Sequence, residues 1–278
     1  MQGFLRKLFG KRTYSEKEEL LKAFLAGKLS IAIPIDIEAI AVLNMFEHCV
    51  IKPSEKDKHN SVAYVNKIIE TLAELPETIE CNIDIGSGFR YPIKINKIDV
   101  LKSLIRILEI SKNAYLAYIN LLWEAIEEYL NNLESKILQL PLVSSDRVKI
   151  TLPGISLGEN VKVSIIEIVS EQTYTAEITK NFVLGSILGL IKAFLEAVCD
   201  LSPKLFEIKA REIRDTLRIR VIKIYGLSEK VDGALKCYDE IVASIRNKCP
   251  KMSSRIIDIL DELIVKAEKY LPDSRQAF

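Results

Sequence analysis

The side chains that most often carry out acid–base, nucleophilic or metal chemistry are few in this chain and far apart. It has two histidines, His48 and His59, and five cysteines. The cysteines are Cys49, Cys81, Cys199, Cys237 and Cys249. Zinc sites need several such ligands at short spacing, as in CxxC or HxxxH, and neither spacing occurs. We therefore predict no metal site, and we interpret His48 as a helix-end histidine beside a buried thiol.

No motif for phosphate binding or covalent catalysis occurs in the structural context that it needs. Gly86-Ser87-Gly88 has the glycines of a phosphate loop, but no GK[ST] follows and a hairpin turn explains it better. HExxH does not occur. GxSxG occurs once, at Gly154 to Gly158, but between two expected strands and not in the strand–turn–helix context of a nucleophile elbow. Carboxylates are numerous, yet they lie among lysines and apolar residues, as on solvated helix faces. We expect no catalytic residue, cofactor or small-molecule substrate. An enzyme with an unrecognised carboxylate or cysteine site is the least favoured of three functions, after the two binding functions described below.

The first 12 residues are the strongest indication of what the protein contacts. They hold four positive charges in a chain of net charge +1, so the remainder sums to −3. On a helix the apolar and basic residues of this segment would lie on opposite sides. It is either a flexible tail or an amphipathic segment that docks on a partner protein or an anionic membrane. The predicted contact residues are Phe4, Leu5, Arg6, Lys7, Leu8, Phe9, Lys11 and Arg12.

A second basic segment extends from Lys204 to Lys223. It has seven basic and three acidic residues, a net charge of +4 (seven minus three). On a helix Arg211, Arg214 and Arg218 share a face that could meet phosphates. Nucleic-acid binding through these arginines is therefore the alternative function, although a salt-bridged surface is more usual in a near-neutral protein.

The elements that must position these residues give an α+β, predominantly helical fold with one or two β-hairpin layers. Helices are expected from the capping box at Ser15 to Gly27, from Asp36 to about Val50, and from Ser61 to about Leu75. Later helices are expected at about 99–110, 113–138, 182–200, 203–215, 228–247 and 254–271. Strands are expected at about 30–35, 79–96 (a hairpin), 147–152, 161–169 and 173–179.

Two segments allow more than one interpretation. Residues 216–225 alternate like a strand but also continue the helical repeat of Phe206 and Ala210, and we favour a helix. Residues 182–199 are apolar enough to test as a membrane span. Lys192 and Glu196 near its centre instead indicate a core helix with one narrow polar stripe.

For domains, we predict a basic tail (1–14) and a single globular body (15–278). A shift of 83 residues aligns 95–108 with 178–191, each after a hairpin and before another helix. This suggests two similar hairpin–helix–helix halves, about 79–140 and 147–226, followed by a helical segment, 228–271.

The composition suggests the setting in which the chain works. It has 39 Ile, 27 Lys and 26 Glu but 4 Gln, a bias of hyperthermophiles that an AT-rich genome also produces. We expect a thermophilic archaeon or its virus as the source. Widely spaced cysteines and no signal peptide predict a cytoplasmic protein, peripheral at a membrane at most, with mostly buried thiols, and one disulfide remains an alternative. The sequence thus predicts a non-enzymatic interaction protein that binds a protein partner or itself.

Overall fold

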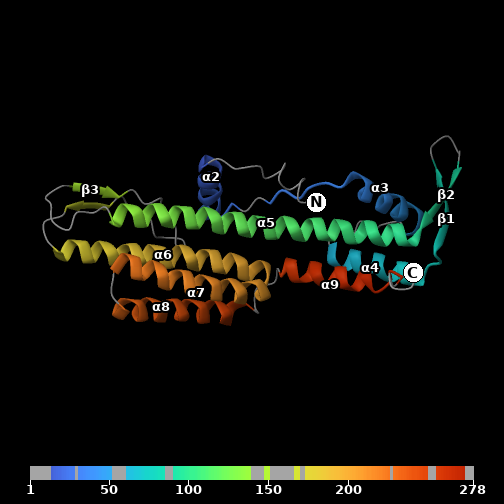
Figure 1. Ribbon diagram of the computed structural model, residues 1–278. Helices are drawn as coiled ribbons and strands as arrows, with labels where there is room; N and C mark the ends of the chain where they lie inside the picture. Colours follow the sequence, from blue (N-terminus) through green and yellow to red (C-terminus); the bar gives the residue numbers. More distant parts are fainter. Residues whose placement is uncertain are drawn as a thin grey trace, which may run out of the picture. The chain divides into compact units, whose positions relative to one another are not determined.

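The computed structural model describes residues 14–28, 31–51, 61–84, 90–138, 147–150, 166–169, 173–225, 228–249 and 255–272. These residues are mostly helical with small antiparallel hairpins, which confirms the predicted α+β class (Figure 1). The elements in chain order are α2 (Tyr14–Leu25), α3 (Ile37–Phe46), the π-helical turn η1 (Glu47–Ile51), α4 (Ser61–Glu74), β1 (Thr78–Asp84), β2 (Arg90–Asn96), α5 (Lys97–Leu138), β3 (Arg147–Ile150), β4 (Ile166–Val169), α6 (Thr173–Leu201), α7 (Pro203–Tyr225), α8 (Ser228–Lys248) and α9 (Ile256–Glu268).

The chain divides into two compact units, each assembled from separate stretches of sequence. Unit 1 comprises residues 1–30 and 117–255, and unit 2 comprises residues 31–116 and 256–278. Helix α5 contributes to both. These boundaries differ from those of the halves expected at 79–140 and 147–226, and the duplication itself stays a prediction.

Unit 2 is organised around the first part of α5. Asp36 caps α3 by accepting a hydrogen bond from the Ala39 backbone N–H at 3.1 Å, and its second oxygen lies 2.5 Å from the Arg106 guanidinium of α5. Strands β1 and β2 pair with Ile79 opposite Ile95, and both side chains are buried. The expected hairpin and the Asp36 cap are therefore confirmed. The fully buried side chains of this core include Phe46, Ile69, Leu72, Val100 and Leu101.

Unit 1 contains the helices that carry the candidate site. Helix α7 packs against both α6 and α8, and α6 also contacts α8 (Figure 1). The Ser202 hydroxyl accepts a hydrogen bond from the Leu205 N–H at 3.1 Å, so α7 begins where the sequence predicted. Helix α5 contributes Trp123, whose ring lies 5.0 Å from that of Phe194 on α6.

Helix α5 is continuous where the sequence predicted a break between residues 110 and 113. The Ser111 hydroxyl donates to the Ile107 carbonyl at 2.9 Å, four residues back, so the polar side chain is satisfied without ending the helix. Lys112 forms an ion pair with Asp261 of α9. The two predicted helices, 99–110 and 113–138, are therefore one, and the first expected half has a hairpin followed by a single helix.

Two predicted strands are wrong. Residues 31–36 form no strand, although an isoleucine lies at every second position from Ile31 to Ile37. Residues 173–179 begin helix α6. Both segments are rich in residues that favour strands, but a strand also needs a partner strand to pair with. At 173–179 the chain instead forms the first turns of the long apolar helix α6. Strand β3 pairs with β4, Arg147 opposite Val169, and the remainder of the two expected strands, 151–152 and 161–165, lies outside the described residues.

The remaining helical predictions hold. Gly27 has a φ of +69° and its N–H donates to the Phe24 carbonyl at 2.9 Å, so it ends α2 as expected. Residues 216–225 are helical, as we favoured. Helix α6 has its expected apolar side buried, with Lys192 and Glu196 3.9 Å apart on the polar side. No helix in the described ranges combines the length and apolar character needed to cross a bilayer.

The cysteines correct a prediction. Four of the five form disulfides, Cys49–Cys81 in unit 2 and Cys199–Cys249 in unit 1, with Cα–Cα distances of 5.6 and 5.8 Å. Cys237 is free and exposed. The sequence predicted mostly buried thiols with one disulfide as an alternative, because spacing alone does not reveal which cysteines approach each other in the fold.

Candidate functional site

The candidate functional site is the solvent-facing side of helix α7. The opposite side of this helix packs into the core of unit 1 through residues that recur every three or four positions. Its buried apolar residues are Phe206, Ala210, Ile213, Leu217, Val221 and Ile224. This stripe extends through the segment that the sequence left ambiguous, so the whole basic segment is one amphipathic helix with a defined outer side.

The outer side of α7 carries large apolar side chains. Ile208, Ile219 and Ile222 are 52%, 57% and 47% exposed. At 100° per residue they lie within roughly 60° of one another and opposite the buried stripe. Isolated exposed isoleucines are normal on a protein surface, but three aligned on one helix face form an apolar strip.

Charged residues lie within and beside the same strip. Lys204 and Asp215 are exposed within the arc of the three isoleucines, and Arg211 and Arg218 are exposed on one side of it. Glu212 and Lys223 are exposed on the other side, where Glu212 forms an ion pair with Lys209. We call the three isoleucines together with Lys204, Arg211, Asp215 and Arg218 the α7 outer face. It combines apolar surface with three positive charges and one negative charge, so it can bury isoleucines against a partner and pair charges around them.

Arg214 differs from its neighbours because it has a partner within unit 1. Its guanidinium makes a two-pronged contact with Asp239 of α8, at 2.9 Å and 3.0 Å. The hydrogen bonds from Arg214 lower the pKa of the Asp239 carboxyl. An open depression beside this pair is lined by Arg214, Asp232, Leu235, Lys236, Asp239, Glu240 and Ala243.

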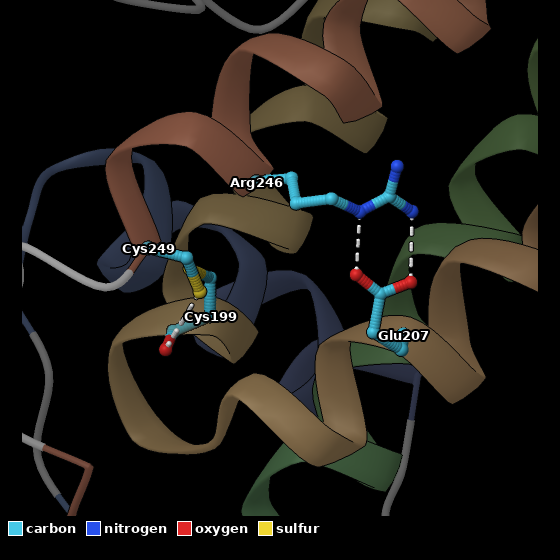
Figure 2. Close-up of polar contacts among 4 residues, drawn as sticks. All are labelled: Cys199, Glu207, Arg246 and Cys249. Atoms are coloured by element: carbon cyan, nitrogen blue, oxygen red, sulfur yellow. Dashed lines mark hydrogen bonds and ion pairs between the residues drawn. A yellow bond between two sulfur atoms is a disulfide. The ribbon is translucent and has the colours of Figure 1, made fainter.

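A second charged pair links α7 to α8 one turn from the start of α7. Figure 2 shows the Arg246 guanidinium facing the Glu207 carboxylate, with contacts of 2.6 Å and 2.8 Å. These hydrogen bonds lower the pKa of Glu207. The disulfide Cys199–Cys249 lies at the same end of the three helices, and both of its cysteines are buried (Figure 2). The α7 outer face therefore lies on a helix that is fixed to α8 by two ion pairs.

All three arginines that the sequence grouped together are exposed on α7. Arg214 differs from the other two because its guanidinium also contacts Asp239 of α8. A phosphate would therefore compete with Asp239 for Arg214, and it would meet Asp215 near Arg211 and Arg218. The three exposed isoleucines are not among the contact residues predicted from the sequence, although their positions opposite the core stripe already break the amphipathic pattern of the helix.

The tail residues from Phe4 to Arg12 lie outside the described residues, so their predicted role stays a prediction. Among the residues that the structure does describe, no three His, Cys, Asp or Glu side chains are grouped closely enough to hold a metal ion. His48 is exposed in the η1 turn.

No protein-family model matches this sequence, and neither the curated proteins nor the solved structures give a significant match. Function is therefore inferred from the chain's own surface.

Proposed function

We propose that this chain is an interaction protein that binds a macromolecular partner through the α7 outer face. The observation that supports this proposal is the alignment of Ile208, Ile219 and Ile222, each about half exposed, on a helix held by core packing and ion pairs. Burying such side chains against a partner stabilises a complex by roughly 1 kcal/mol each, since half of the gain from full burial is still available.

The N-terminal segment is proposed as a second contact, with a protein complex or an anionic membrane surface. Its four basic and four apolar residues support this role. A short segment of this kind binds membranes weakly on its own, so it would act together with the first surface. Co-sedimentation with anionic vesicles tests it: equal pelleting of the full chain and a variant lacking residues 1–12 would contradict the membrane version.

Nucleic-acid binding by Arg211, Arg214 and Arg218 is the weaker proposal. Asp239 already neutralises Arg214, and Asp215 would face any phosphate that Arg211 and Arg218 approached. An affinity for DNA or RNA that falls steeply as the salt concentration rises would support this alternative. A cytoplasmic location and a thermophilic archaeal or viral source are proposals from composition alone.

Site-specific photocrosslinking tests the main proposal. A benzophenone amino acid replaces Ile219 in the full chain, and Val265 of α9, which is 53% exposed, is the matched control position. Irradiation in expressing cells should give protein adducts from position 219 in clear excess over position 265, measured by gel shift and mass spectrometry. Equal yields at the two positions would contradict a specific contact at the α7 outer face.

A further inference from the structure

The sequence order of charges along the α7 outer face suggests what binds it. Arg211 and Asp215 are separated by one helical turn, and Ile208 and Ile219 lie beyond them at the two ends of this charged pair. A point near position 213 is therefore about midway between Arg211 and Asp215 and also about midway between Ile208 and Ile219. A two-fold axis through that point exchanges the members of each pair.

We propose that the α7 outer face binds the same face of a second copy of this chain, with the two α7 helices antiparallel. Arg211 of each copy then faces Asp215 of the other, and Ile208 of each copy packs on the other's Ile219. Because the contact is isologous, every pairing occurs twice. This inference rests on the proposed function and names its partner.

The charges select the antiparallel arrangement. In a parallel pair related by a two-fold axis, Arg211, Asp215 and Arg218 would each lie beside their own symmetry copies, so all three contacts would be repulsive. The antiparallel arrangement replaces two of these repulsions with two Arg–Asp attractions. Lys204 lies roughly 14 Å along the helix from the axis, at the rim, where solvent screens its charge.

The same charges make the face a poorer match for a uniformly anionic partner. A phosphate backbone or an anionic membrane would attract Arg211 and Arg218 but repel Asp215 between them. A second copy satisfies Asp215 as well. Arg211, Asp215 and Arg218 are exposed, so their charged groups can approach a partner. Within the same copy Arg211 interacts electrostatically with Glu207 and Asp215 with Arg214, and both interactions are at the surface, where solvent screens them.

A helix pair of this kind gives a modest interface. Ile208 to Ile222 spans roughly 21 Å of helix, and stable dimers usually bury about 800 Å² on each partner. We therefore expect a reversible dimer whose population depends on protein concentration.

Charge-reversal variants of the full chain test the pairing. Arg211→Asp gives a face in which Asp meets Asp, and Asp215→Arg gives one in which Arg meets Arg. Each single variant should dimerise roughly tenfold or more weakly than the wild type, measured by sedimentation equilibrium. An equimolar mixture of the two single variants should recover association as a heterodimer, and the double variant Arg211→Asp/Asp215→Arg should recover the homodimer.

The controls separate a change of contact from a change of fold. Glu240→Arg reverses an exposed charge on α8 and should leave the dissociation constant unchanged. Circular dichroism should show the same helicity in all variants, since the substituted positions are exposed.

Cysteine crosslinking tests the antiparallel register directly. The variants Ile208→Cys and Ile219→Cys are each made in a Cys237→Ser background, which removes the exposed free thiol. Mixing the two variants under oxidising conditions should give a disulfide between different chains, seen as a dimer on a non-reducing gel. Neither variant alone should give this product, because in the antiparallel register position 208 faces position 219 of the other copy. Crosslinking of each variant with itself and not with the other would contradict the register.

The outcomes distinguish this inference from the proposed function. The two-fold contact is overturned if the wild type stays monomeric. It is also overturned if the dissociation constant of the dimer is unchanged in both single charge-reversal variants. If position 219 still photocrosslinks to a different protein, the interaction function stands and the partner is another chain. If neither association nor specific crosslinking occurs, both proposals fail.

Discussion

Two tyrosines of unit 1 have buried hydroxyl groups that differ in hydrogen bonding. The Tyr238 hydroxyl donates a hydrogen bond to the Ala210 carbonyl at 2.7 Å, which joins α8 to α7. The Tyr129 hydroxyl on α5 is buried with no hydrogen-bond partner among the described residues. Burial raises the pKa of Tyr129 to about 12 and that of Tyr238 further, so both are neutral phenols at physiological pH.

Removing these hydroxyl groups should therefore give different results. Tyr238→Phe should lower the free energy of unfolding by about 1 kcal/mol, because a satisfied buried hydrogen bond is lost. Tyr129→Phe should be neutral or stabilising, because it removes a hydroxyl that was desolvated without compensation. Urea unfolding followed by circular dichroism measures both. Equal losses in the two variants would contradict the assigned hydrogen bonding.

The two surface ion pairs of α7 and α8 predict how stability depends on pH. Arg246 lowers the pKa of Glu207 from an ordinary value of 4.5, and Arg214 lowers that of Asp239 from 3.8. A carboxyl whose pKa is lower in the folded state stabilises that state above its unfolded pKa. This contribution is lost as the pH falls through the folded pKa. All four side chains are more than a third exposed, so solvent screening keeps each contribution at about 0.5 kcal/mol.

The double variant Glu207→Gln/Asp239→Asn should thus be less stable than the wild type by about 1 kcal/mol near pH 7. The difference should shrink as the pH falls below about 5 and disappear where the wild-type carboxyls are protonated. Urea unfolding across this range measures it, with Glu262→Gln on α9 as the control. A difference that stayed constant down to low pH would mean that packing, not charge, accounts for the loss.

Helix α7 is attached to α5 by a buried charged pair that the sequence does not reveal. The Arg220 guanidinium lies 2.5 Å from Glu134 and 3.0 Å from the Asn131 side-chain oxygen of α5. Both charged side chains are more than nine-tenths buried. The sequence shows Arg220 only as one of the seven basic residues of 204–223, and the fold places it on the side of α7 that faces α5.

Breaking this pair should be far more harmful than replacing it. Glu134→Leu alone leaves the Arg220 charge buried without its carboxylate and should cost about 3–5 kcal/mol of stability. The double variant Glu134→Leu/Arg220→Met exchanges both charges for apolar groups and should recover most of that loss. Thermal unfolding of the two variants provides the comparison. A double variant no more stable than Glu134→Leu would show that shape at this position, and not charge burial, limits stability.

Elements with strong local signals were predictable from the sequence. The Asp36 cap, the Gly27 stop, the Ser202 start and the 79–96 hairpin depend on nearby residues, and the structure confirms all four. The predictions that were wrong depend on distant contacts. Residues 31–35 were expected to form a strand but have no strand partner in the described part of the chain. Residues 110–113 were expected to break a helix, but Ser111 and Lys112 make contacts that keep α5 continuous and that local helix propensity does not predict. At the candidate site, spacing placed Arg211 and Arg218 correctly, but the contact between Arg214 and Asp239 required the fold.

At the scale of the whole molecule, each compact unit contains one disulfide. Cys49–Cys81 closes a loop with a sequence separation of 32 in unit 2, and Cys199–Cys249 closes one of 50 in unit 1. Constraining loops of these lengths in the unfolded chain corresponds to about 4 kcal/mol each in the chain-entropy description. The longer loop contains all of α7 and α8, so this disulfide constrains the part of unit 1 that carries the α7 outer face.

Reduction should therefore lower the stability of the full chain substantially. Cys199→Ser/Cys249→Ser and Cys49→Ser/Cys81→Ser should each reduce the free energy of unfolding by about 2–4 kcal/mol under oxidising conditions, measured by urea unfolding. Cys237→Ser should have no such effect, because Cys237 is exposed and unpaired. Adding a reductant to the wild type should reproduce the combined loss, whereas the variant lacking all four paired cysteines should not respond to it. If the wild type were equally stable with and without reductant, the two crosslinks would not contribute to the fold, and core packing alone would hold α7 in place.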